Sequence, residues 1–418
     1  MIKTRLSLAV TTSIFGLSLS PIANAEFIKD TTATLEARNY YFNRDFRQEG
    51  ASQSRREEWA QGFIMRVDSG YTEGAVGVGL DAIGMFGFKL DSGGGTAGTN
   101  LLVPDRSGGS QDNSSDLAVA AKAKFSDTAV RVGSMQFKNM AISSSDGRLL
   151  PQVFRGGQLI STEFERLLLD GGYLSQVNHR DSGDFEDLKV KAGGKRGINV
   201  GGDNSSDAFK FLGGNYRVTE DMTASYYYSN LEDLYKQNSF NLVQVLPLGE
   251  GQSLKADLRY TRSTDDGRSN VDNKALGAMF TYSLAGHSVG LGYQKMNGDT
   301  GAAYIGGTDP FLVNYVQISD FANKDESSWQ ARYDFDFKGV GIPGLKFMTR
   351  YLSGDNVDLG ATAGDGKEWE RDIELKYVFQ QGPLKNLSVR WRNAMVRSNF
   401  TNDVDENRLI LSYTLPLL

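Results

Sequence analysis

The 418-residue chain contains no cysteine and only two histidines, His179 and His287. The absence of cysteine excludes a disulfide framework, a thiolate-bound metal and a cysteine nucleophile. Because histidine is so scarce, we expect no enzymatic activity, no metal and no cofactor. Lys and Arg number 45 against 51 Asp and Glu, a net charge of −6. This balance argues against nucleic-acid binding, which needs a basic surface.

Long apolar segments are also missing. Beyond residue 25 no apolar run approaches the roughly 20 residues that a membrane-spanning helix needs, and the mean hydropathy is −0.38. Residues 1–25 combine a basic start, an apolar stretch and the small-residue sequence Ala23-Asn24-Ala25. We therefore predict a cleaved secretory signal peptide over 1–25 and one mature domain over 26–418, an ordinary first helix being the alternative.

Apolar and polar side chains alternate along much of the mature chain. In 328–337, Trp329 and Tyr333 fall on one face, whereas Arg332 and Asp334 fall on the other. This period of two marks half-apolar strands. We count about 18 strands, beginning near residues 31, 57, 73, 115, 128, 158, 171, 206, 222, 236, 253, 274, 287, 328, 344, 368, 385 and 406. Alternation alone fits both a soluble sandwich and an outer-membrane barrel, whose apolar face meets lipid.

The connections between these strands favour the barrel. Short ones alternate with longer ones, and the longer ones are 43–56, 88–114, 138–157, 180–205, 262–273, 297–327, 353–367 and 397–405. The connection near 230–236 is the only exception, because it is short at a place where the alternation predicts a long connection. Trp59, Trp329 and Trp369 follow long loops and share the apolar face, as an aromatic girdle requires. We predict an all-β, transmembrane antiparallel β-barrel of about 18 strands, with short periplasmic turns and long external loops.

If apolar positions face lipid, basic residues of the opposite parity face the lumen. These are Arg38, Arg66, Lys122, Lys124, Arg131, Lys255, Arg259, Arg332, Lys346, Arg350, Lys376, Arg390 and Arg392. Arg390 and Arg392 are the sharpest pair, because their own strand offers no acid on that face. Guanidinium groups would attract carboxylates through paired hydrogen bonds, and conduction needs sites weak enough to release them. The alternative is that these bases only balance lumenal acids, among them Asp257, Asp334, Asp336, Asp372 and Glu374.

The third long loop, 138–157, carries apolar side chains at 149, 150, 153 and 154. Such side chains are out of place in solvent, so we expect this loop to fold inward and narrow the pore. It would then offer Arg148 and Arg155 to solute. A loop packed on its outer neighbours is the alternative. The loop 297–327 also contains an apolar stretch and is the second candidate for an inward fold.

Four stretches resemble the OprD family of substrate-specific outer-membrane porins: 35–46, 58–63, 146–151 and 239–241. The resemblance runs over the whole mature chain and implies an 18-stranded barrel with an inward third loop. It also implies a basic ladder that passes small carboxylate-bearing solutes, such as amino acids or aromatic and cyclic acids. The implied ladder members are Arg38, Arg131, Arg390 and Arg392, with Arg148 and Arg155 on the third loop. The ending Leu417-Leu418 departs from the aromatic terminus of many outer-membrane proteins.

We therefore expect a passive, substrate-selective channel in the outer membrane of a Gram-negative bacterium. Its partners would be small carboxylate solutes and outer-membrane lipid. The residues expected to guide solute are Arg38, Arg131, Arg148, Arg155, Arg350, Lys376, Arg390 and Arg392. The strand count suggests that one chain makes its own pore, and the resemblance implies a monomer or a loosely associated oligomer. A general, non-selective porin is the main alternative; an outer-membrane enzyme and a structural adhesin are remote ones.

Overall fold

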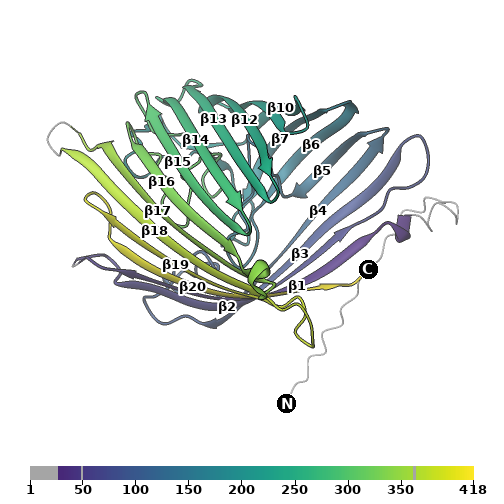
Figure 1. Ribbon diagram of the computed structural model, residues 1–418, viewed down its shortest axis with the longest axis horizontal. Helices are drawn as coiled ribbons and strands as arrows, with labels where there is room; N and C mark the ends of the chain where they lie inside the picture. The colour runs from purple at the N-terminus through teal and green to yellow at the C-terminus, as the bar shows by residue number, and fades with distance from the viewer. Residues whose placement is uncertain (1–26, 49, 361–363) are drawn as a thin grey trace, which may run out of the picture.

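The computed structural model describes residues 27–48, 50–360 and 364–418, so the predicted signal peptide lies outside the described residues. Eighteen antiparallel strands form one sheet (Figure 1). They are β1(Thr32–Phe46), β2(Arg55–Asp68), β3(Gly77–Asp91), β4(Asn113–Phe125), β5(Thr128–Met135), β6(Val153–Phe164), β7(Leu167–Asn178), β10(Phe209–Arg217), β11(Met222–Leu231), β12(Tyr235–Gly249), β13(Gln252–Asp265), β14(Asp272–Leu284), β15(His287–Asn297), β16(Ser327–Asp336), β17(Leu345–Asp358), β18(Asp365–Val378), β19(Ser388–Ser398) and β20(Val404–Pro416). The remaining elements are the short hairpin strands β8(Leu188–Lys189) and β9(Ser205–Ser206) and the 3-10 helix η1(Phe337–Val340).

The sheet closes on itself. Strand β1 pairs antiparallel with β20, with Leu35 opposite Leu415, so the wall has no free edge. Closure satisfies the backbone hydrogen bonds that lipid cannot. The predicted antiparallel barrel of about 18 strands is confirmed, and its largest error in a strand start is at β6, predicted near 158 and observed at Val153. No helix in the described ranges is long and apolar enough to span a membrane.

The outer face of the barrel is apolar, as the alternation predicts. On β2, Phe63 and Met65 are exposed, whereas Ala60 and Ile64 between and beside them are fully buried inside. Trp329 on β16 is likewise exposed. Because exposed and buried positions alternate along each strand, the outer side chains face lipid and the inner ones line the lumen.

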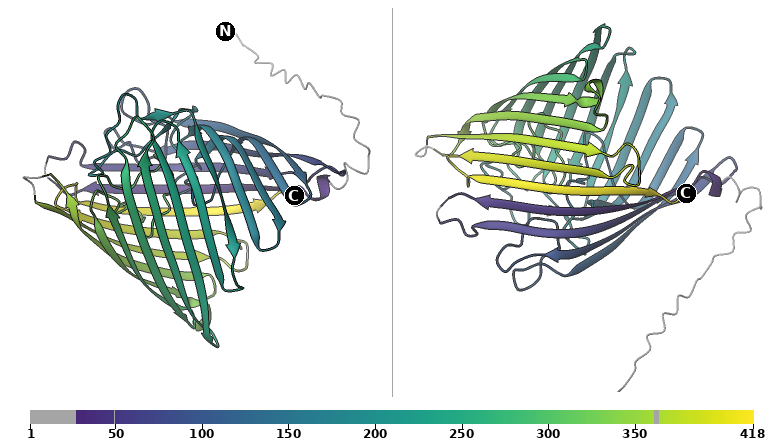
Figure 2. Two further views of the ribbon diagram at one scale, coloured as in Figure 1. Left: turned by 90° about the horizontal axis from the view of Figure 1, so that it is seen from above. Right: turned by 60° about the horizontal axis from the view of Figure 1, so that its bottom comes forward.

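The long loops gather at one end of the barrel, and the C-terminus lies at the other (Figure 2). Two of the predicted long loops are shorter than expected. The hairpin β17–β18 remains paired up to Asp358 and Asp365, and β19–β20 leaves only 399–403 unpaired. Backbone pairing does not require apolar side chains, so these strands continue past the alternating pattern. The connection between β11 and β12 is short, as expected, at 232–234.

The long loops that fold into the lumen include those here named L3 (136–152), L4 (179–208) and L7 (298–326). In the loop 92–112, also expected to be external, Leu101 is buried with Tyr40 and Ile64 of the inner wall. Leu149 of L3 is fully buried against Tyr40 and Ile64 of the inner wall, which confirms the inward third loop. L4 was expected to be external, but its Leu188 packs with Phe211 and other inner-wall side chains. This apolar packing fills one side of the lumen and leaves the bore along β16–β20 and β1.

Candidate functional site

L7 crosses the lumen and is held by polar side chains of distant strands. The carboxylate of Glu370 on β18 accepts the backbone N–H groups of Ile318, at 2.9 Å, and Ser319, at 2.7 Å. Arg408 on β20 donates to the carbonyl of Gln317 at 3.1 Å. Because these partners lie beyond β16, the strand that L7 enters, the loop forms a bar across the bore.

L3 narrows the bore from the opposite side, along β1 and β2. Arg38 donates to the Asp146 carboxylate at 2.8 Å and to the carbonyl of Arg148 at 2.7 Å. Gly62 on β2 leaves space for Leu149, whose side chain would lie 3.1 Å from a Cβ at that position. Arg38 is 8% exposed, so the structure places this predicted ladder member as a clamp on L3 rather than as a free rung.

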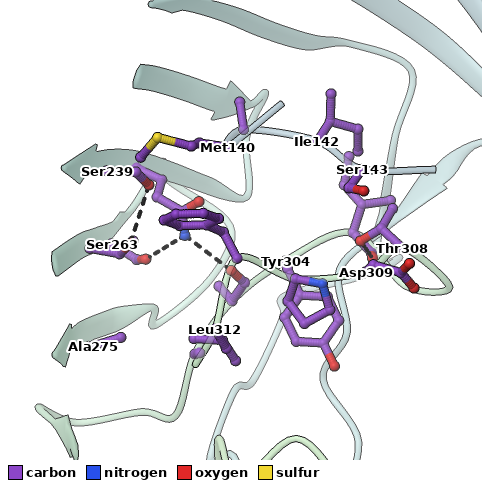
Figure 3. A pocket seen from close by; sticks show the side chains of 18 of the residues that line it. Met140, Ile142, Ser143, Ser239, Ser263, Ala275, Tyr304, Thr308, Asp309 and Leu312 are labelled. Carbon is purple, nitrogen blue, oxygen red and sulfur yellow. Dashed lines mark hydrogen bonds between the residues drawn. The ribbon is translucent and has the colours of Figure 1, made fainter. Parts of the chain in front are cut away.

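L3 and L7 also pack on each other. A pocket of about 30 Å³ separates them from the wall strands β12 to β14 (Figure 3). Gln237 closes it by donating to Ser263 Oγ at 2.9 Å and to the carbonyl of Ala303 at 3.1 Å. The pocket has room for about one water molecule, so it is a packing seam and not a solute site. In the described part of the chain, no group of three or more acidic or histidine side chains is placed to hold a metal ion.

On the outer side of the bar lies a cavity of about 570 Å³, here called the outer cavity. Its charged lining residues are Arg44, Arg148, Arg180, Lys191, Arg196, Asp320 and Glu368. Arg44 pairs with Glu406 at 2.5 Å, and Arg196 pairs with Asp320. The other three basic side chains have no described carboxylate oxygen within 4 Å. Sequence reasoning missed Arg180 and Lys191, since a loop has no alternation that tells which way a side chain points.

Arg148 is the predicted L3 residue that reaches this cavity. Its guanidinium donates to the carbonyls of Thr99 and Gly147, both at 3.1 Å, and lies 5.3 Å from the Phe42 ring centre. Burial and the neighbouring Arg408 lower the pKa of Arg148 to about 9. The group stays charged near pH 7. Burial is the largest cause of the lowered pKa, and the positive charge of Arg408 is the second.

On the side of the short turns lies a second cavity of about 450 Å³, the inner cavity. Its charged lining residues are Arg332, Asp334, Asp336, Lys346, Arg350, Glu374, Lys376 and Arg392. The strand register places Lys346, Lys376 and Arg390 side by side on β17, β18 and β19. Lys376 has no described carboxylate within 4 Å. The lumen therefore carries uncompensated basic charge on both sides of the bar.

Arg390 and Arg392 have no inward acid on their own strand, as expected, but the neighbouring strand supplies one. Glu374 on the adjacent strand β18 lies 3.7 Å from Arg390 Nε and 3.1 Å from Arg392 Nε. Arg350 is paired in the same way, 2.7 Å from Asp372. The register between β18 and β19 places Glu374 opposite Arg392. These bases are thus partly neutralised rungs, not free cations.

Arg131 and Arg155 lie apart from both cavities. Arg131 on β5 is 3.5 Å from the Asp81 carboxylate. Arg155 on β6 donates to Gln176 at 2.6 Å and stacks 4.2 Å from the Phe185 ring centre. The structure therefore brings Arg148, Arg350, Lys376 and Arg392 to the bore lining, with Arg390 beside them. Arg408, which anchors L7 and is 2% exposed, was missed, although Leu409 facing lipid predicts an inward neighbour.

A closed 18-stranded barrel with an apolar outer face, inward loops and a charged bore defines an outer-membrane porin. The family model described as outer membrane porin, OprD family, matches residues 25–417, and the chain belongs to this family. The family and the barrel together indicate the outer membrane of a Gram-negative bacterium.

Several relatives match over nearly the whole chain. The crystal structure of Pseudomonas aeruginosa OpdQ is 58% identical, with a TM-score of 0.88, and covers 94% of this chain and 100% of its own. The porin-like protein GalP of Pseudomonas putida is 39% identical over 422 residues, 98% of each chain. Pseudomonas aeruginosa OpdK, crystallised with vanillate, is 39% identical with a TM-score of 0.85, covering 93% and 100%.

Proposed function

We propose that this porin takes up small carboxylate-bearing solutes, passively and selectively, through its basic bore. The observation that carries the proposal is the distribution of basic side chains on both sides of the bar formed by L3 and L7. A carboxylate entering from outside meets Arg148 first and then Arg392 and Lys376. Guanidinium groups bind carboxylates bidentately and keep their charge near pH 7.

The paired acids fit transport better than tight binding. Glu374 faces both Arg390 and Arg392, and Asp372 faces Arg350. Each acid weakens the hold of its arginine on a passing anion. Conduction requires sites that attract solute and still release it. The vanillate bound to the relative OpdK, an aromatic carboxylate, supports the same solute class.

The proposal includes export by a signal peptide over 1–25 that is cleaved, and a pore made by one chain, as a monomer or in a loose oligomer. No catalytic step and no cofactor are involved. The mature protein would then begin at Glu26, which N-terminal sequencing of protein from outer membranes measures directly.

The experiment that tests the function is single-channel recording in planar bilayers, with benzoate, succinate and arginine as blockers. We expect one of these carboxylates to block the wild type and Arg390→Ala/Arg392→Ala to lose that block. The control Glu163→Gln removes an exposed acid near the end of β6 that accepts from Ser126 Oγ and lies outside both cavities. A large conductance that ignores every carboxylate and the mutations would instead identify a general porin.

A further inference from the structure

Two guanidinium groups of the outer cavity lie close to Gly147 in L3. Arg148 Nη1 donates to the Gly147 carbonyl at 3.1 Å. Arg180 Nη1, which enters from L4, donates to Ser145 Oγ at 2.9 Å and lies 4.0 Å from the position of a Cβ on Gly147. Gly147 has no side chain to cover either guanidinium group, and both groups line the outer cavity.

Lys191 adds a third cation and is held in place by loop pairing. Its backbone N–H donates to the carbonyl of Tyr304 in L7 at 2.8 Å. Gly306 donates back to the carbonyl of Lys189 at 2.8 Å. L3, L4 and L7 therefore each contribute to the cavity, and the backbone that carries Lys191 is fixed against L7.

The charge in this cavity is not balanced. Arg148, Arg180 and Lys191 have no carboxylate partner among the described residues, and the only lining acid without a cationic partner there is Glu368. Glu368 instead accepts from Ser319 Oγ at 3.1 Å and from Asn323 Nδ2 at 3.2 Å. Three such basic side chains against this one acid leave an excess of two positive charges, and Arg408, which shares Glu406 with Arg44, adds to it. The lowered pKa of Arg148 has the same origin, burial and positive neighbours that include Arg180.

We propose that the outer cavity is a capture site for small solutes with two carboxylates, which it prefers over solutes with one. The inference rests on the proposed function and names its substrate class. A monocarboxylate leaves one of the two excess charges uncompensated, whereas a dicarboxylate compensates both. One carboxylate bridges Arg148 and Arg180 across Gly147, and the other faces Lys191. A volume of about 570 Å³ is in the range of about 300–1,000 Å³ typical of small-molecule sites.

The test compares succinate with succinamate, which has nearly the same shape but only one carboxylate. Both are added as blockers to single wild-type channels and to Arg180→Gln and Lys191→Gln channels. We expect succinate to half-block at a concentration about tenfold lower than succinamate, equivalent to about 1.4 kcal/mol. Each variant should lose most of that preference. The matched control Lys195→Gln removes one charge from the same loop but from outside the cavity lining, and should keep it.

The outcomes distinguish a failure of the dicarboxylate preference from a failure of the proposed carboxylate uptake. Equal block by succinate and succinamate in the wild type overturns the dicarboxylate preference and leaves carboxylate uptake standing. A preference that survives both variants overturns the assignment to this cavity. If neither compound blocks, the dicarboxylate inference fails, and block by benzoate or arginine then decides whether the proposed function stands. Block by inorganic phosphate as strong as that by succinate shows a charge-selective site and overturns the carboxylate assignment. Circular dichroism of each variant confirms that the barrel has formed.

Discussion

The guanidinium of Arg38 on β1 donates to the carboxylate of Asp146 in L3 at 2.8 Å, so the pore wall itself holds the loop that narrows the pore. The same guanidinium donates through Nε to Glu36 at 2.9 Å. Arg38 is almost enclosed, with its side chain 10% exposed, whereas Asp146 is 38% exposed. Arg38 therefore belongs to the basic wall but serves to hold L3 in position. It affects a passing solute only through the shape of the bore.

Arg38→Gln should loosen L3 without removing the barrel. Breaking a fully buried ion pair costs about 3–5 kcal/mol, and the partial exposure of Asp146 places this cost below that range. We expect a larger mean conductance and more frequent current steps in single-channel recordings. Arg131→Gln is the matched control, because Arg131 faces Asp81 and does not contact L3. If Arg38→Gln channels have the wild-type conductance and no additional current steps, Arg38 does not hold L3 in place.

A second prediction concerns the contact between L3 and the wall at Gly62. Any Cβ there would approach the Leu149 side chain to 3.1 Å. Overpacking of a filled site costs about 1–3 kcal/mol, so Gly62→Val should push L3 away from β2 and into the bore. The expected result is a lower conductance, measured in planar bilayers. Gly84→Val on β3, where a Cβ would lie 3.8 Å from Met65 Cβ in ordinary van der Waals contact, should leave the conductance unchanged.

The barrel was predictable because its signal is local. Alternation along a strand such as β2 assigns each side chain to lipid or lumen, and pairing carries that parity to the next strand. The same rule placed Arg350, Lys376 and Arg392 in the lumen. It also predicts the inward position of Arg408, which was overlooked. Apolar residues in a polar loop indicated the inward fold of L3.

What the sequence did not reveal depends on register and on contacts between distant loops. The approach of Glu374 to Arg392 depends on the offset between β18 and β19, which only the folded sheet defines. L4 has no periodicity, so neither its inward path nor the position of Arg180 beside Gly147 was predictable. Arg38 contacts a loop 108 residues further along the chain, and parity alone could not distinguish this clamp from a free rung.

A third prediction uses the acid that Arg390 and Arg392 share. Glu374→Gln removes the negative charge and leaves both guanidinium groups without their cross-strand partner. Carboxylate block should strengthen and anion selectivity should rise, the opposite of the change expected when the arginines are removed. Reversal potentials in a salt gradient and half-blocking concentrations measure both. Glu163→Gln, which removes an exposed acid near the end of β6, is the control; equal shifts in both variants would mean a bulk charge effect.

The fourth prediction concerns pH and the point where the three inward loops meet. His179 of L4 has its Nδ1 3.1 Å from Gln152 Nε2 of L3, and Gly307 of L7 packs against its ring. The charged groups that face it are Glu186, whose carboxylate is 3.9 Å from Nε2, together with Asp181, Arg180 and Lys189. Burial lowers the pKa of His179 below its ordinary value of 6.5, because the buried ring disfavours the imidazolium form.

The direction of this pH dependence follows from how many protons the docked and undocked loops bind. Undocked loops let His179 titrate at its ordinary pKa near 6.5, whereas the docked junction holds that pKa lower. The undocked state therefore binds more protons, and docking weakens as the pH falls from about 6.5 through the lower pKa. We expect current steps between conductance levels to become more frequent over this range.

His179→Gln retains a partner for Gln152 but cannot be protonated, so its channels should lose this pH dependence. His287→Gln, at a turn where the ring contacts Tyr333 at 2.8 Å, should keep it. If His179→Gln channels respond to pH as the wild type does, carboxyl groups rather than this histidine control the junction.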